Sequence, residues 1–319
     1  MLLMHGVALA RNALVDDDQN RVQLIGEAAR KRIDDARDGT TARGLIPTGV
    51  VGLDERFGMM SAGSLTTLAA KTSIGKTQFA LQILQACSRR GIPSLILSLE
   101  MSAGELSDRY LCELAQIDPK TFRQEPSNLL DADWERLEAS AETLANWPLT
   151  VWDASTVSIP QLKAMARVWK SQHVKDRGLI VVDYLQLLTT ATGNESRANK
   201  VAALARGTKN IAHDLQLPLL QLSQLNRQVT ENEPPTLNHL KESGGVEENS
   251  DNVWFLHRPN FIVNGVRTTQ EVEEAQIIVA KMRNSSLGVV NVEYRPGIGF
   301  MDPLPARYSQ FDQFNNGNL

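Results

Sequence analysis

A short stretch that joins an apolar run to a lysine and a threonine has the clearest chemical content. Residues 65–70 are mostly apolar, and residues 71–77 read KTSIGKT. In a phosphate-binding loop, backbone amides and the start of a helix face the phosphates, a lysine adds charge and a hydroxyl binds Mg²⁺. Lys76 and Thr77 occupy those two positions, which predicts binding of ATP and Mg²⁺. The general motif opens with glycine, and Ala70 stands there instead, so the loop alone is an incomplete match.

Three more polar residues stand at the ends of apolar runs, namely Glu100, Asp183 and Gln224. Ligands of open α/β sheets bind at the carboxyl ends of the strands. There Asp183 could orient Mg²⁺, Glu100 could accept a proton from the attacking water, and Gln224 could hydrogen-bond the γ-phosphate. Taken singly, each has a simpler interpretation: a turn residue, a glutamate favoured by a helix dipole, and a polar cap.

Two cations, Lys281 and Arg283, stand two residues apart near the C-terminus. Strand alternation would place both side chains on one face, which is costly unless an anion faces them. An arginine supplied by a neighbouring subunit can raise phosphoryl-transfer rates by about 10³–10⁵. The alternative is a solvated basic strand face.

The elements that must position these residues follow an alternating pattern. Expected strands are 65–69, 93–99, 149–153, 178–183 and 217–223; expected helices are 76–89, one from 102 with Ser102 and Glu105 as capping box, 131–146, 158–173 and 197–215. Strands 274–281 and 289–294 close the chain. This order predicts an α/β fold with a mostly parallel central sheet flanked by helices and an antiparallel C-terminal extension.

Composition sets broad limits on function. With 319 residues and 42% hydrophobic content, the chain can form one α/β domain with a small appendage. Its formal charge of −4 means that contact with nucleic acid must come from a local patch. Cys87 and Cys112 lie in predicted helices, as expected for buried thiols in a reducing compartment, so we expect a cytoplasmic protein. No run is long enough to span a membrane, so no membrane partner is expected.

An amphipathic helix is predicted near the N-terminus, at about residues 16–39, before a break at Gly39–Gly44. Its apolar stripe includes Ile25 and Ile33 and needs a partner. Packing on its own domain and docking on an adjacent subunit both remain open at this point.

Together these residues resemble the ATPase domain of the DnaB family of replicative DNA helicases, a hexameric, RecA-like group of P-loop NTPases. The resemblance runs from Gly44 to the last strands and starts with Pro47, Thr48, Gly49, Leu53 and Asp54. Five motifs follow in family order: Ala70–Thr77 (AKTSIGKT), Ser98–Ser102 (SLEMS), Val182–Leu187 (VDYLQL), Leu222–Arg227 (LSQLNR) and Lys241–Gly244 (KESG). Alanine also opens the family's phosphate loop, which removes the objection to Ala70.

The resemblance implies a role for each site residue. Nucleotide contacts would come from Ser73, Gly75, Lys76, Thr77 and Gln78, with Arg109 against the adenine. Thr77 and Asp183 would hold the metal. Glu100 would be the catalytic base, and Gln224 would be the γ-phosphate sensor. Lys281 and Arg283 would act in trans, with Arg283 as the arginine finger. Lys241, Glu242 and Gly244 would hold single-stranded DNA, in a sequence-independent and salt-sensitive mode.

The expected organisation has three parts. Residues 1–45 would form an N-terminal segment whose helix resembles the family linker, which favours docking on a neighbouring subunit. Residues 46–305 would form the RecA-like ATPase domain, and 306–319 a flexible tail. The family's N-terminal collar, which meets primase, has no counterpart ahead of the helix. Ser285 replaces a frequent family glycine, and residues 229–235 carry little positive charge, which argues against strong DNA affinity.

Two functions are therefore in competition. The first is a ring-forming, homo-hexameric, ATP-dependent replicative helicase that moves 5′ to 3′ on single-stranded DNA and unwinds duplex, with a helicase loader or primase as further partner. The second is a RecA-like DNA-binding ATPase, such as a recombinase, or a helicase-derived partner that does not unwind DNA itself. The direction of movement comes only from the resemblance.

Overall fold

The computed structural model describes residues 25–39, 44–189, 197–225, 233–243, 245–263, 266–267, 270–283, 285–296 and 298–303. The chain divides into two compact units, residues 1–44 and 45–319. In the first unit, the helix α2 spans Ile25–Arg37. The first part of the predicted helix at 16–39 and the predicted tail at 306–319 lie outside the described residues.

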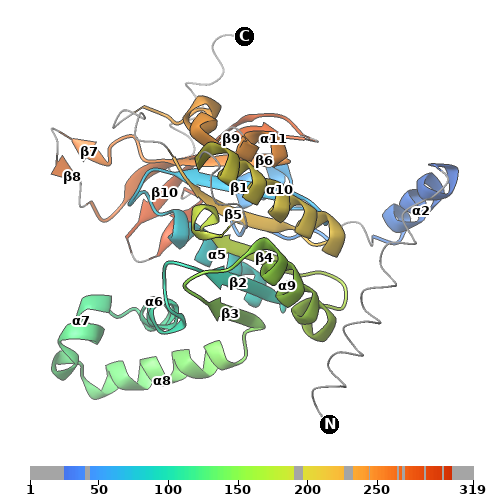
Figure 1. Ribbon diagram of the computed structural model, residues 1–319. Helices are drawn as coiled ribbons and strands as arrows, with labels where there is room; N and C mark the ends of the chain where they lie inside the picture. The colour runs from blue at the N-terminus through green and yellow to red at the C-terminus, as the bar shows by residue number, and fades with distance from the viewer. Residues whose placement is uncertain are drawn as a thin grey trace. The chain divides into compact units, whose positions relative to one another are not determined.

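The second unit contains the alternating strands and helices (Figure 1). Its helices are α4 (Val51–Phe57), α5 (Lys76–Ser88), α6 (Ala103–Ala115), α7 (Pro119–Gln124), α8 (Asp131–Ala145), α9 (Ile159–His173), α10 (Arg197–Leu215) and α11 (Gly245–Asn249), with short 3₁₀ turns η1 (Pro126–Asn128), η2 (Leu185–Leu187) and η3 (Leu237–Ser243). Its strands are β1 (Leu65–Ala70), β2 (Ser94–Ser98), β3 (Leu149–Asp153), β4 (Leu179–Asp183), β5 (Leu219–Gln224), β6 (Asn252–His257), β7 (Ile262–Val263), β8 (Val266–Arg267), β9 (Glu273–Met282), β10 (Gly288–Arg295) and β11 (Gly299–Met301).

One large sheet positions the functional residues. Its order is β11-β10-β9-β6-β1-β5-β4-β2-β3, and the strands from β6 to β3 run parallel, whereas β9, β10 and β11 are antiparallel additions. In the register, Ala70 lies opposite Gln224, and Ser98 lies opposite Asp183. The carboxyl ends of β1, β5, β2 and β4 therefore share one edge of the sheet.

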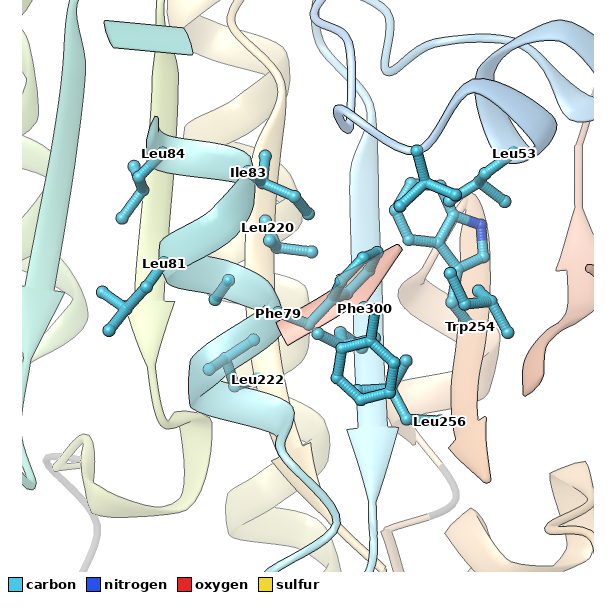
Figure 2. Packing of buried hydrophobic residues seen from close by; sticks show 14 of the residues in the cluster. Leu53, Phe79, Leu81, Ile83, Leu84, Leu220, Leu222, Trp254, Leu256 and Phe300 are labelled. Carbon is cyan, nitrogen blue, oxygen red and sulfur yellow. The ribbon is translucent and has the colours of Figure 1, made fainter. Parts of the chain in front are cut away.

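Helices cover both faces of this sheet. Along β4, Leu179 and Val181 belong to one buried cluster, and Ile180 and Val182 belong to another, as strand alternation requires. Helix α5 packs on the first face, where its side chains meet those of β5, β6 and β11 (Figure 2). Helices α9 and α10 pack on the second face, and α10 crosses β1 and β5 (Figure 1). The strands are apolar in both alternating positions because both faces are buried.

The predicted fold class is confirmed, but the sequence pattern missed several elements, of which β6 matters most for the site. The sequence pattern predicts no strand between residues 223 and 274, yet β6 lies there, is fully buried and pairs with β1. Helices α4 and α7 were not predicted either. The capping box of Ser102 and Glu105 is present at the start of α6, and both cysteines are free and buried, as expected.

In the described part of the chain, no helix combines the length and the apolar content that crossing a bilayer requires.

A close contact between α11 and α10 gives a test of the packing. A Cβ atom on Gly245 would lie 2.2 Å from the Ala202 Cβ and 2.6 Å from the Ala202 Cα. Since backbone cannot move aside cheaply, we expect Gly245→Ala to lower the free energy of unfolding by about 1–3 kcal/mol. Gly104→Ala is the matched control, because Gly104 lies in the first turn of α6 with no contact nearer than 3.9 Å. Thermal unfolding checks both variants, and equal midpoints would contradict this close approach of the two helices.

Candidate functional site

The phosphate loop connects the buried strand β1 to helix α5 at the carboxyl edge of the sheet. Ser73 has φ 69° and Gly75 has φ 114°, so the backbone turns through the left-handed region twice within three residues. A Cβ on Gly75 would lie 3.1 Å from the Phe300 ring and 3.2 Å from the Tyr294 ring. Both the dihedral and the close approach therefore require glycine, and the loop rests on two aromatic side chains of the C-terminal strands.

Helix α5 begins at Lys76, so its first turn directs unpaired backbone amides toward the space in front of the loop. The Lys76 ammonium lies 4.9 Å from the centre of the Tyr184 ring. Burial lowers the pKa of Lys76, and the carboxylates of Asp183 and Glu100 partly counteract that effect. A partly desolvated cation of this kind is well placed to receive a phosphate.

Thr77 and Asp183, the two residues predicted to bind the metal, are in direct contact. The Thr77 hydroxyl donates a hydrogen bond to Asp183 Oδ2 at 3.0 Å, across the edge from α5 to β4. Burial raises the pKa of Asp183, and Lys76 and Thr77 oppose that rise. Asp183 Oδ1 is buried and has no hydrogen-bond partner among the described residues. A buried carboxylate oxygen without a partner is costly, so this donor set fits a hard cation such as Mg²⁺.

The remaining predicted residues of the nucleotide site surround one pocket of about 1260 Å³. Its lining includes Ser73, Gly75, Lys76, Thr77, Gln78, Glu100, Arg109 and Gln224. The Gln224 amide donates to the Thr72 hydroxyl at 2.9 Å, which ties the end of β5 to the loop. Glu100 and Arg109 are exposed, so their side chains are free to turn toward a ligand.

Lys281 and Arg283 lie at the opposite edge of the sheet, where the parallel strands begin. Met282 pairs with Asn252, and Asn252 pairs with Thr66, near the start of β1. The phosphate loop begins after Ala70, four residues further along β1, which corresponds to about 13 Å of strand. Lys281 Nζ donates to the Glu247 carbonyl at 2.7 Å. The two cations are thus not part of the pocket of their own subunit.

The predicted DNA-binding residues are only partly described. The backbone of Lys241 and Glu242 forms part of η3, and Gly244 lies outside the described residues. Helix α11 starts at Gly245, directly after this segment.

The phosphate loop is also supported by a buried arginine that the sequence does not predict. Arg258 is 4% exposed and pairs with Glu273 at 2.5 Å, and its Cζ lies 4.0 Å from the centre of the Tyr294 ring. Its Nη1 also approaches the Ser73 and Ile74 carbonyls at 3.5 and 3.4 Å. Arg258 follows β6, and because that strand was not predicted, nothing in the sequence placed this arginine beside the loop.

Comparison with known proteins agrees with the geometry. The family model described as the DnaB-like helicase C-terminal domain matches residues 45–301. The replicative DNA helicase DnaB of Helicobacter pylori is 30% identical over 331 residues, covering 93% of this chain and 67% of the relative. The replicative DNA helicase DnaC of Bacillus subtilis is 33% identical over 253 residues, covering 78% of this chain and 54% of the relative. The chain therefore spans between about half and two thirds of these relatives.

Solved structures give the same result. One solved ATPase domain superposes with a TM-score of 0.79 at 26% identity, covering 89% of this chain and 100% of that domain. A DnaB-like replicative helicase, whose interactions with primase were described, superposes with a TM-score of 0.77 at 25% identity, covering 94% of this chain and 72% of that one. Fold, phosphate loop and family model agree, and the chain belongs to the DnaB-like helicase C-terminal domain family.

Proposed function

We propose that this chain is the ATP-driven motor of a replicative DNA helicase, which assembles as a homo-hexameric ring in the cytoplasm and moves 5′ to 3′ along single-stranded DNA. The observation that supports the proposal is the separation between the phosphate loop and the two cations that would act on a neighbour's phosphate. The phosphate loop lies at one edge of the sheet, and Lys281 and Arg283 lie at the other. Such a subunit needs a neighbour to complete its site.

Within one subunit, the residues of the pocket divide the work on ATP. The loop amides from Ser73 onward, with Lys76, would bind the β- and γ-phosphates, while Gln78 and Arg109 would contact the rest of the nucleotide. Thr77 and Asp183 would hold Mg²⁺, which when bound neutralises charge on the phosphate oxygens. Glu100 would accept the proton of the attacking water, and Gln224 would hydrogen-bond the γ-phosphate.

Across the subunit boundary, Arg283 would stabilise the charge that develops on the transferred phosphoryl group, with Lys281 beside it. An arginine that reaches a neighbour must be accessible, and the Arg283 side chain is 72% exposed. The N-terminal unit supports the same assembly. On α2, Ile25 and Ile33 are 86% and 52% exposed, so this helix has an apolar stripe to offer to an adjacent subunit.

The segment of Lys241, Glu242 and Gly244 would hold the phosphates of single-stranded DNA in the channel of the ring. Binding through phosphates is independent of sequence and weakens with salt. A helicase loader or a primase would be a further partner, as the solved relative described with primase suggests.

Unwinding is the direct test of the proposal. On forked DNA with ATP and Mg²⁺, the purified protein should displace the paired strand, and a substrate with only a 3′ tail should not be unwound. Lys76→Ala is the control, because it removes the lysine of the phosphate loop. Robust ATP turnover without strand displacement under any loading condition would overturn the helicase proposal and favour a RecA-like ATPase that does not unwind DNA.

Arg283→Ala tests catalysis across the boundary. We expect kcat to fall by about 10³-fold or more, because the positive charge acts on the transition state. Nucleotide affinity, measured by titration with a fluorescent ATP analogue, should stay within about twofold, since tight ground-state contacts come from the other subunit. Arg136→Ala, on the exposed surface of α8, should leave both unchanged. Equal losses of affinity and turnover would place Arg283 in the site of its own subunit.

Lys241→Ala tests the DNA segment. Removing one phosphate contact should weaken single-strand binding severalfold and make its salt dependence shallower by about 0.7 in log–log slope. ATP turnover without DNA should hardly change. Fluorescence anisotropy over a salt series checks the prediction, with the exposed Lys175→Ala as control. An unchanged affinity and slope would remove Lys241 from the DNA site.

A further inference from the structure

Arg283 has a partner at the edge of the sheet that the proposed function does not assign. The Arg283 Nη1 donates to Asp251 Oδ1 at 3.1 Å. The arginine side chain is 72% exposed, whereas that of Asp251 is only 10% exposed. A pair of two exposed groups would contribute little to stability, but here one of the two is held inside the protein.

Two separate segments, the start of β1 and helix α10, fix the position of Asp251. Its Oδ2 accepts hydrogen bonds from the Leu65 backbone amide at 2.8 Å and from Lys209 Nζ at 2.5 Å. Lys209 in turn donates to the Gly63 carbonyl at 2.9 Å. Burial alone would raise the pKa of Asp251, but these partners, together with Arg283, hold it below its ordinary value. Asp251 is therefore a charged and rigid group at the working pH.

The two carboxylate oxygens have different partners. Oδ2 accepts hydrogen bonds from the start of β1 and from helix α10, and Oδ1 accepts the hydrogen bond from Arg283. A carboxylate needed only to join β1, α10 and β6 would not require that second contact. An arginine carries five N–H donors, so a bond from Nη1 to Asp251 leaves other donors for a phosphate.

The same segment also holds the second cation. Lys281 donates to the Glu247 carbonyl of α11, and Asp251 follows that helix by two residues. Lys209, Asp251 and Arg283 line a pocket of about 440 Å³ at this edge, which leaves space beside the guanidinium. Residues 245–251, which directly follow the proposed DNA segment, thus carry the attachment points of both cations.

We propose that Asp251 is a positioning residue for Arg283, which holds the guanidinium ready for the nucleotide of the neighbouring subunit. This inference rests on the proposed role of Arg283 in trans. A long, exposed arginine side chain samples many rotamers, and a fixed carboxylate behind it restricts them. A misplacement of about 1 Å in such a group can reduce the rate on the order of 100-fold.

Steady-state ATP hydrolysis by the full chain with single-stranded DNA tests the inference. In Asp251→Asn, the amide can still accept from Leu65 but loses the charge that attracts Arg283. We expect kcat to fall about 10- to 100-fold, with KM for ATP within twofold, because the contact matters in the transition state. Asp214→Asn is the matched control: Asp214 pairs with Lys163 at 2.5 Å and is 20% exposed. Its kcat should stay within twofold of wild type.

A double variant separates positioning from general support of the fold. On an Arg283→Ala background, whose residual turnover is measured by release of labelled phosphate, Asp251→Asn should cause no further loss. A further loss of tenfold or more would show that Asp251 acts through something other than Arg283 and would overturn the inference. A wild-type kcat in Asp251→Asn beside an inactive Arg283→Ala would overturn the inference alone. Normal turnover in Arg283→Ala would instead remove the proposed finger.

Asp251→Glu covers the case in which the asparagine variant does not fold. Glutamate keeps the charge and a partner for Lys209, but it moves the carboxylate by about one C–C bond, ~1.5 Å. We expect a folded protein, by circular dichroism, with kcat lowered about tenfold and unchanged KM. A folded Asp251→Glu protein with wild-type kcat would contradict a positioning role.

Discussion

The complete burial of β1 is the constraint on which the rest of the structure depends. All six residues of the strand are buried, with β5 on one side and β6 on the other and helices over both faces. A strand enclosed in this way can present nothing but its ends. Its carboxyl end becomes the phosphate loop, and its amino end, at Leu65, holds Asp251. The two functional edges are therefore fixed to each other through a rigid core, because packed interiors do not deform gradually.

Much of this arrangement could be predicted from the sequence. Parallel strands bring their carboxyl ends to one edge, so Glu100, Asp183 and Gln224 are expected near the loop. Glu100 and Gln224 line the pocket, and Asp183 accepts a hydrogen bond from Thr77. The loop could be recognised from local sequence, because the apolar strand, the glycine and the Lys-Thr pair at the helix start are neighbours in the chain. Family motifs added the roles of these residues, which strand order alone could not supply.

The parts that could not be predicted depend on contacts between distant segments. Strand β6 is apolar and short, and no period distinguishes it from a buried helical turn. Without it, neither the support of the loop by Arg258 nor the pairing of Asp251 with Arg283 could be foreseen. The pairs Arg258–Glu273 and Asp251–Arg283 each join residues that are 15 or more positions apart. Their geometry comes from the register between β6 and β9, which contains a bulge at Val253 and Trp254.

The separation of the two edges also gives each subunit a direction. In the proposed assembly, one edge would receive the nucleotide and the other would offer Arg283, so two copies that meet through these edges would be related head to tail. In such an assembly, the number of complete sites equals the number of closed boundaries: an open chain has one site fewer than it has subunits, and a closed ring has none missing. Loss of Arg283 from one subunit would then stop ATP hydrolysis at the site of the neighbouring subunit. The subunit that lacks Arg283 would still hydrolyse the ATP in its own pocket.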